Sequence, residues 1–318
     1  MNASLARPRL ASALVVFAAA IAAPAGQERA AGPEAPRTKI VLLGTGTPSP
    51  IPERSGPATA IIVNDTAYLV DFGPGVVRRA YGAATTRSIP ALQPIRLRVA
   101  FVTHLHSDHT AGYPDLILTP WTVGRQTPLE VYGPKGIKEM TEHVLQAYRV
   151  DIETRTNPEG NQRTFPDGHK VNAHEVAAGV VYKDANVTVT AFATRHAMES
   201  YGYRFDTADR SVVISGDTNP TQATIDACHG CDVLIHEVHT AAWLAQRPEA
   251  GGAPAGTFRR FSEQYHTTTT QLAELARQAK PRLLILYHYN SLSPEELQSE
   301  MMREYGGHFV IGRDLDVY

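Results

Sequence analysis

Three features are scarce in this chain of 318 residues: net charge, cysteine and long apolar runs. It has 30 lysines and arginines against 32 aspartates and glutamates, so the formal net charge is −2. A chain with so little net charge has no long-range attraction for a polyanion. This argues against a broad nucleic-acid-binding surface, although it does not exclude a local basic patch.

The chain has only 2 cysteines, and both lie in the segment Cys228-His-Gly-Cys231. Two cysteines alone are a weak signal for a zinc site. In an oxidising compartment their spacing allows a local disulfide, and the alternative is a pair of buried free thiols. Either way, we expect a structural role.

The N-terminus has an apolar run, Leu10–Ala23, that Ser12 interrupts. The run is shorter than the ~20 residues that a membrane-spanning helix needs. Two arginines precede it and a small-residue stretch follows it, which is the pattern of a secretory signal peptide over residues 1–25. The leader contains no cysteine that could carry a lipid anchor. We therefore expect an exported protein, periplasmic or secreted, without a membrane span.

The rest of the chain is expected to form one domain. Residues 26–38 are rich in alanine, glycine, proline and charge, so we expect them to be a disordered lead-in. Residues 39–318 contain no internal repeat and no break in composition, and they are enough for one large core. We expect a single domain over 39–318.

Strands in this domain are predicted to end in residues that can bind a metal. A buried strand over Leu97–Val102 leads directly into a cluster of three histidines and an aspartate. Further strand-like runs lead to other histidines and carboxylates, namely His196, Asp217, Glu237 and His288. Mixed strands and helices with polar residues gathered at strand ends indicate an α/β fold.

The cluster after the first of these strands carries the clearest chemical signal. Successive side chains in an extended backbone alternate, so His104 and His106 point to the same side and can share one ion. After the turn at Ser107, Asp108 and His109 can point back toward the same space and hold a second ion. The spacing therefore suggests two metals.

The pattern H-x-H-x-D-H followed by Thr-Ala-Gly resembles the signature of the metallo-β-lactamase-fold hydrolases. The similarity extends from about Lys39 to the C-terminus. Within that superfamily the sequence looks most like the branch of ribonuclease Z and the zinc-dependent arylsulfatases and phosphodiesterases. The resemblance implies a four-layer αββα sandwich.

The resemblance also implies a set of metal ligands. The first zinc would be held by His104, His106 and His196. The second would be held by Asp108, His109 and His288, with Asp217 as the bridge between the two. Mn²⁺ or Fe²⁺ can use similar ligands. A hydroxide shared by the two ions would be the nucleophile.

Three further roles come from the same resemblance. His266 would act on the reacting oxygens or the leaving group, and Glu237 would orient His266. Asp108 would orient the attacking water in addition to binding metal. Asp71 would lie beneath the metal-binding loop, whereas His236 and His239 have no matching role and are expected to be structural.

We expect attack on a small phosphodiester or aryl sulfate ester. One alternative is a ribonuclease Z-like activity at the 3′ end of tRNA. Two observations oppose it: the expected export, and the short segment between His196 and Asp217, where such enzymes often carry a tRNA-clamping insertion. Lactone or β-lactam hydrolysis is a second alternative, and a non-catalytic zinc protein is a third. A homodimer is also compatible with the sequence.

Two stretches are expected to be loops. Residues 151–175 are polar, and the histidines within them, His169 and His174, are interpreted as solvated. Residues 245–258 are rich in glycine, proline and alanine and are expected to form an exposed loop. Between the loop and the last ligand, residues 267–278 have the spacing of a helix.

Overall fold

The computed structural model describes residue 1 and residues 38–159, 165–247 and 254–318. Apart from residue 1, the expected signal peptide over residues 1–25 lies outside the described residues, as does the lead-in over residues 26–38 except for Thr38. From Thr38 onward, the described chain lies within one compact unit.

The N-terminal half of this unit builds a sheet of six strands in the order β1-β2-β3-β4-β5-β6. The first three strands are antiparallel neighbours, and β3 to β6 run parallel to one another. Parallel neighbours need a crossover, and helices or loops provide it here. The strand bounds are β1 Thr38–Gly44, β2 Ala58–Val63, β3 Thr66–Val70, β4 Val99–Phe101, β5 Leu129–Gly133 and β6 Val171–Glu175.

The C-terminal half builds a sheet of seven strands in the order β13-β12-β11-β10-β9-β8-β7. Strands β7 to β10 are antiparallel neighbours, whereas β10 to β13 are parallel. Its bounds are β7 Gly179–Lys183, β8 Val187–Ala193, β9 Tyr201–Thr207, β10 Ser211–Ile214, β11 Val233–His239, β12 Leu283–Asn290 and β13 Phe309–Ile311.

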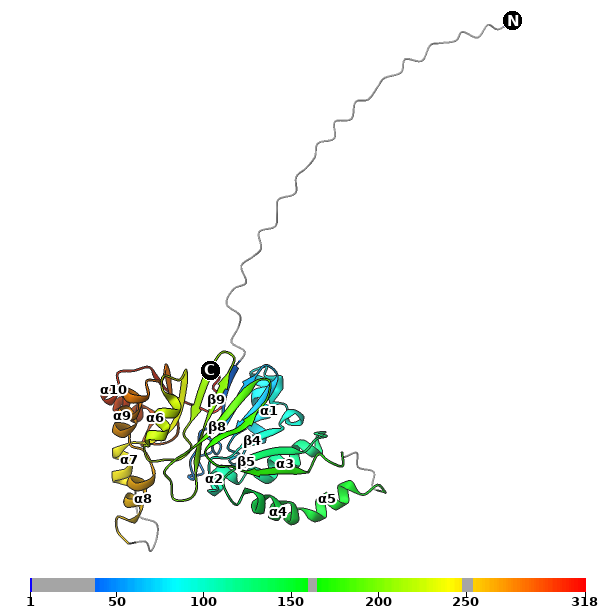
Figure 1. The fold of residues 1–318 in the computed structure, drawn as a ribbon, viewed down its shortest axis with the longest axis horizontal. Coiled ribbons are helices and arrows are strands. Elements are labelled where there is room, and N and C mark those ends of the chain that lie inside the picture. The colour runs from blue at the N-terminus through cyan, green and yellow to red at the C-terminus, as the bar shows by residue number, and fades with distance from the viewer. Residues whose placement is uncertain (2–37, 160–164, 248–253) are drawn as a thin grey trace. The chain divides into compact units, whose positions relative to one another are not determined.

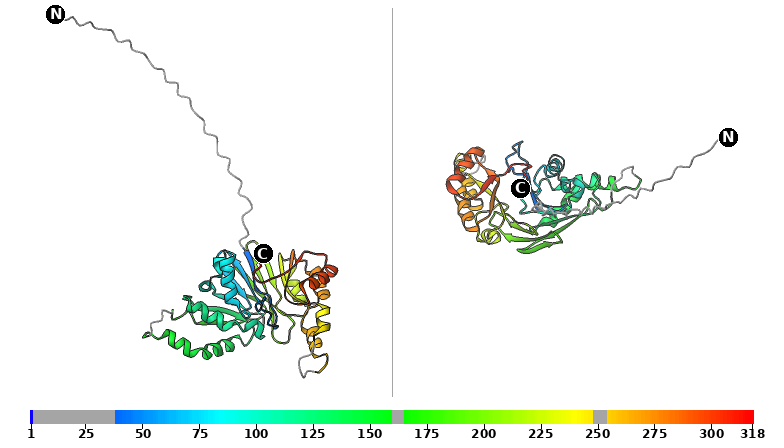
Figure 2. Two further views of the ribbon diagram at one scale, coloured as in Figure 1. Left: turned by 180° about the vertical axis from the view of Figure 1, so that it is seen from behind. Right: turned by 90° about the horizontal axis from the view of Figure 1, so that it is seen from above.

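Three buried apolar clusters hold the layers together. One lies between the two sheets, one between the first sheet and its helices, and one between the second sheet and its helices. Figure 1 shows α1 and α3 on one side of the strands and α6, α9 and α10 on the other, and Figure 2 shows the same layers from behind and from above. The expected four-layer αββα sandwich is thus confirmed.

The helices follow the amphipathic pattern that such layers require. On α9, for example, the buried residues include Leu272, Leu275 and Ala276, and a Thr268–Gln271 capping box begins the helix. The helix bounds are α1 Val76–Thr86, α2 Ser107–Thr110, α3 Tyr113–Thr122, α4 Ile137–Ala147, α5 Arg149–Thr156, α6 Gln222–Cys228, α7 Ala241–Gln246, α8 Thr257–Tyr265, α9 Thr269–Ala279 and α10 Pro294–Glu304.

The prediction of a loop over residues 151–175 is wrong at both of its ends. The end of α5 occupies its start and β6 occupies its end. His174 is not simply solvated, because its Nε2 lies 2.9 Å from Glu130 Oε2 and its ring stacks on Tyr132. The His169 ring packs on Trp121, with 5.0 Å between the ring centroids.

The two cysteines form a disulfide at the end of α6, which is one of the two outcomes that their spacing allowed. Within the described part of the chain, none of the helices combines the length and the apolar character needed to cross a membrane.

Candidate active site

The first expected metal triad assembles where three segments meet. Strand β4 ends at Phe101, and the chain then places His104 and His106 on one side just before α2. His196 arrives from the segment after β8. The Nδ1 atom of His106 lies 3.0 Å from Nε2 of His104 and 3.0 Å from Nε2 of His196. These three nitrogens converge as ligands of a single ion would.

The second expected triad, Asp108, His109 and His288, lies beside the first. The expected bridge, Asp217, contacts it through Oδ1, which is 3.3 Å from His109 Nε2 and 3.1 Å from His288 Nε2. Asp217 also groups with His104 and with His196. The structure therefore brings all seven expected ligand side chains together, with Asp217 between the two triads.

The chemistry of these donor atoms fits divalent cations. Buried polar atoms normally have hydrogen-bond partners. Yet His109 Nε2 and Asp217 Oδ1, which face each other, are both buried and make no hydrogen bond within the described chain. Burial also lowers the pKa of His104 well below its ordinary value and that of His196 to about 4, so both rings remain neutral donors. Imidazole and carboxylate ligands of this kind suit Zn²⁺.

Hydrogen bonds behind the ligands fix their orientation. His109 Nδ1 donates to Asp71 Oδ2 at 2.9 Å, and Asp71 also accepts from the backbone N–H of Thr103 at 2.8 Å. The Nδ1 atom of His288 donates to the Gly46 carbonyl. Each contact leaves Nε2 free to face a metal. As expected, Asp71 lies beneath the loop, and its backbone φ of 62° is unusual for a residue other than glycine.

Two glycines permit the close approach of backbone segments around the ligands. At Gly73, an added Cβ would meet the Asp108 carbonyl oxygen at 2.4 Å. At Gly216, which directly precedes the bridging Asp217, φ is +62° and a Cβ would lie 2.8 Å from the Thr103 side chain. Only glycine fits both requirements without a backbone shift.

The partly buried His266 and the buried Glu237 form a pair next to the metal ligands. The His266 Nδ1 atom lies 2.9 Å and 3.0 Å from the two Glu237 carboxylate oxygens and 4.0 Å from Asp217 Oδ2. Glu237 is fixed in turn by the backbone N–H of Thr218, at 2.7 Å. Burial alone would lower the pKa of His266, but the neighbouring Glu237 and Asp217 carboxylates outweigh it and raise the pKa to about 9. The ring is therefore a cation at neutral pH.

A cavity of about 290 Å³ opens over this cluster. Metal ligands and His266 form one part of its wall, and side chains of α7 and α8 form another. Phe261 is part of this wall, whereas Trp121 is fully buried in α3 and does not line the cavity.

His239, which was expected to be structural, also lines the cavity. His236 is different: it is completely buried, and its Nδ1 lies 2.7 Å from the Glu237 carbonyl oxygen. Trp243, Arg247 and Phe258 also lie in the wall and were not predicted from the sequence. The regular spacing of four residues from His239 to Trp243 to Arg247 was the available signal.

Comparison with known proteins agrees with this geometry. Residues 66–289 match the family model described as the β-lactamase superfamily domain. The chain belongs to the metallo-β-lactamase superfamily. Among its relatives, the ribonuclease Z of Mycobacterium bovis strain BCG Pasteur is 32% identical over 288 residues, which cover 87% of this chain and 96% of the relative.

Solved structures of the metallo-β-lactamase superfamily have the same fold. A metallo-β-lactamase-fold protein from Bacillus subtilis superposes with a TM-score of 0.66 at 18% identity, covering 88% of this chain and 98% of that protein. The short form of human tRNase Z gives 0.62 at 20% identity with the same coverage. These likenesses establish the fold.

The protein is thus a hydrolase of the metallo-β-lactamase superfamily. The match to ribonuclease Z over most of both chains assigns it to that branch. These relatives are named as ribonucleases, which conflicts with the expectation, drawn from the net charge and the expected export, that nucleic acid is an unlikely partner. They give no support to an arylsulfatase activity.

Proposed function

We propose that this protein is a metal-dependent phosphodiesterase that cleaves RNA in the manner of its ribonuclease Z relatives. The observation that carries the proposal is the His266–Glu237 pair, which lies beside two metal-competent triads that share Asp217. A cationic imidazole next to a two-metal centre suits the cleavage of a phosphorus–oxygen bond, in which the leaving oxygen must gain a proton.

Two zinc ions would be held by the seven side chains described above, with Asp217 contacting both. When bound, such ions polarise phosphoryl oxygens and lower the pKa of water. The protein's own contribution is orientation. Asp71 and the Gly46 carbonyl hold the rings of His109 and His288 so that Nε2 faces inward in each.

His266 supplies the acid in this proposal. Its cationic ring can donate a proton to the leaving oxygen, and Glu237 holds the ring toward the cavity. Asp108 also lines the cavity, so its second oxygen can accept a proton from an attacking water. We therefore keep the roles that the sequence suggested for Asp108, His266 and Glu237.

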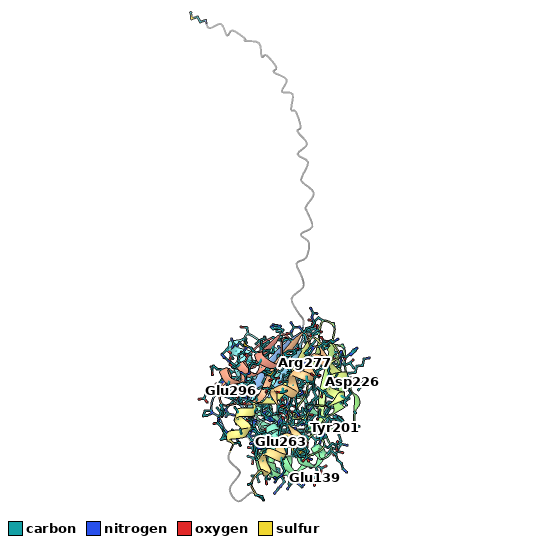
Figure 3. All side chains as sticks on the ribbon, turned by 90° about the vertical axis from the view of Figure 1, so that its left-hand side faces the viewer. Glu139, Tyr201, Asp226, Glu263, Arg277 and Glu296 are labelled. Atoms are coloured by element: carbon teal, nitrogen blue, oxygen red, sulfur yellow. A yellow bond between two sulfur atoms is a disulfide. The ribbon has the colours of Figure 1, made fainter. Side chains whose placement is uncertain are left out.

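A small phosphodiester is the second candidate substrate, and a specific observation supports it. Between His196 and Asp217 the chain forms only β9 and β10, which pair as an antiparallel hairpin from Ser211–Asp206 to Ile214–Tyr203. This segment therefore contains no insertion that could serve as a tRNA-clamping arm. In Figure 3, the acidic Glu263 and Asp226 lie on the same face as the basic Arg277. This face is therefore not uniformly basic, as a surface for a long RNA would be.

We also propose that the protein is exported. The apolar leader supports this, and so does the Cys228–Cys231 disulfide, because such bonds persist in oxidising compartments. Export would separate the protein from cytosolic tRNA, so localisation bears directly on the choice between the two substrates.

The substrates can be separated by assaying zinc-loaded protein on a precursor tRNA with a 3′ trailer, on bis(4-nitrophenyl) phosphate and on 4-nitrophenyl sulfate. The proposal predicts cleavage of the precursor at the trailer junction. Turnover of the diaryl ester alone would assign the second candidate. If neither phosphodiester reacts while a lactone or a lactam does, phosphodiester hydrolysis is wrong.

A further inference from the structure

The cavity continues past the metal ligands into a second region, which we call the aromatic lobe. It lies between the end of β11, α7 and α8. Its side chains are His239, Trp243, Arg247, Phe258 and Phe261. None of them is among the expected metal ligands or the acid pair, so the lobe needs a separate explanation.

Three rings of the lobe, those of His239, Trp243 and Phe258, form a continuous series. The centroid of Trp243 is 6.0 Å from that of His239 and 5.8 Å from that of Phe258. The Arg247 guanidinium lies 5.1 Å from the Trp243 ring and 4.9 Å from the Phe258 ring. Trp243 and Phe258 are only partly buried. Aromatic faces that border a cavity can stack on a planar ring of a ligand.

The unpaired ring nitrogen of His239 also indicates that the lobe binds a ligand. Only 2% of this residue is exposed, and its Nε2 atom has no hydrogen-bond partner among the described residues. A buried ring nitrogen without a partner costs free energy unless something satisfies it. Because the ring borders the cavity, a bound ligand with a polar edge can form the missing hydrogen bond.

The lobe lies on the same side of the site as the expected acid. The ring centroid of Phe261 is 5.6 Å from that of His266, which in turn is 5.1 Å from that of His196. Phe261 is also 6.3 Å from His196, so His266 and Phe261 lie side by side where the lobe meets the metal ligands. If His266 protonates the leaving oxygen, the group attached to that oxygen extends toward the lobe.

We infer that the aromatic lobe binds a planar aromatic ring carried by the leaving group of the phosphodiester, with His239 hydrogen-bonded to the polar edge of that ring. The inference rests on the proposed phosphodiesterase function. The ring can be a nucleobase or a simple aryl group. The Arg247 charge then lies beside the ring, where a further phosphate of a longer substrate would find a cation.

Tryptophan fluorescence offers a direct binding test. The chain has 2 tryptophans, and Trp121 is fully buried outside the cavity, so quenching by a ligand in the lobe reports on Trp243. Adenosine 5′-monophosphate added to zinc-loaded protein should quench saturably, and ribose 5-phosphate should not. If the two behave alike, or if W243F is quenched equally, the lobe does not bind the ring.

Two further ligands and variants sharpen this test. If 4-nitrophenyl phosphate binds more tightly than adenosine 5′-monophosphate, the ring is a simple aryl group; the reverse identifies a nucleobase. H239L, which keeps an apolar side chain in the wall, should weaken the binding of adenosine 5′-monophosphate several-fold. Unchanged binding by H239L would overturn the role of His239.

Kinetics can locate the ring on the substrate. W243L should raise KM about tenfold for both bis(4-nitrophenyl) phosphate and methyl 4-nitrophenyl phosphate, because both lose the same aryl group and a stacked ring contributes roughly this much. The control Y81L removes an exposed aromatic ring on α1, outside the cavity, and should leave KM unchanged. An effect of W243L on the diaryl ester alone would place the ring on the retained group and contradict the inference.

The two proposals fail in different ways. Saturable quenching by adenosine 5′-monophosphate without any phosphodiester hydrolysis would keep the lobe and reject the phosphodiesterase. Hydrolysis with normal KM values in folded W243L, checked by circular dichroism, would keep the phosphodiesterase and reject the lobe.

Discussion

His266 is the residue on which the proposed chemistry depends most directly. Its Nδ1 is held by Glu237, and it borders the cavity without belonging to either metal triad. His266 is not one of the seven expected ligands, but its ring lies within 4.8 Å of the ligand atoms of His196 and Asp217, so bound metal must be measured in any His266 variant. The role of His266 can therefore be tested by varying the leaving group of the phosphodiester at a constant metal content.

H266A should slow phosphodiester hydrolysis, and more so for poor leaving groups. Loss of a general acid typically costs about 10²–10⁴-fold, because a basic leaving oxygen depends on the added proton. The measurement is kcat/KM across phosphodiesters whose leaving groups differ in pKa. The control H143A removes an exposed histidine on α4 and should change nothing. An equal loss for every leaving group would show that His266 is not the acid.

The pH profile should report the same residue. Because the carboxylates of Glu237 and Asp217 raise the pKa of His266 to about 9, the ring carries its proton below that pH and loses it above. The rate should therefore fall as pH rises past about 9, and this alkaline fall should be absent from H266A. The same fall in both proteins would assign the ionisation to another group.

Between elements, side chains of the β7–β8 connection hydrogen-bond the second sheet to the first. Asn186 donates to Thr66 and Tyr68, and Asp184 accepts from Tyr68. Asp184, between β7 and β8, accepts from the hydroxyls of Tyr68 on β3, at 2.5 Å, and Tyr182 at 3.0 Å, and from the backbone N–H groups of Asn186 and Val187. Burial alone would raise the pKa of Asp184, but these hydrogen bonds outweigh it and lower the pKa below 3.8.

D184N should destabilise the fold by about 1–3 kcal/mol, the usual cost of losing charge-assisted hydrogen bonds in a partly buried site. The stabilisation by the carboxylate is present above pH 3.8 and is lost as pH falls toward its lowered native pKa, so the difference between wild type and D184N should shrink in acid. Urea unfolding at pH 7 and pH 3 measures this. D226N, at an exposed position on α6, is the control. A difference that does not depend on pH would show that the Asp184 charge does not stabilise the fold.

Some elements around the site could be predicted from the sequence and others could not. The ligands could be predicted because they follow strands with strong apolar patterns, such as β4 and β12, and because parallel strands end at one edge. Helix α5 could not be predicted, because none of its residues is buried and its sequence has no helical repeat of apolar residues. The aromatic lobe was not predicted either. The four-residue spacing from His239 to Arg247 does not show that α8 packs against α7 to complete the lobe.

At the scale of the whole molecule, the metals should also stabilise the fold. The seven expected ligands come from both halves of the chain, from His104 to His288, so ions that bind them join the two sheets. A ligand that binds only the native state adds stability as its concentration exceeds Kd, by about 2.7 kcal/mol at a hundredfold excess. Calorimetry should therefore show a lower Tm after chelation, restored by zinc. An unchanged Tm would argue against the site.

A zinc titration tests whether this protein is a two-metal phosphodiesterase. Chelated protein is given increasing equivalents of zinc, while bound metal and hydrolysis of bis(4-nitrophenyl) phosphate are followed together. We expect activity to rise until two ions are bound per chain and then to level off. Full activity without metal, or two bound ions with no hydrolysis of this ester or of a precursor tRNA, would contradict this expectation.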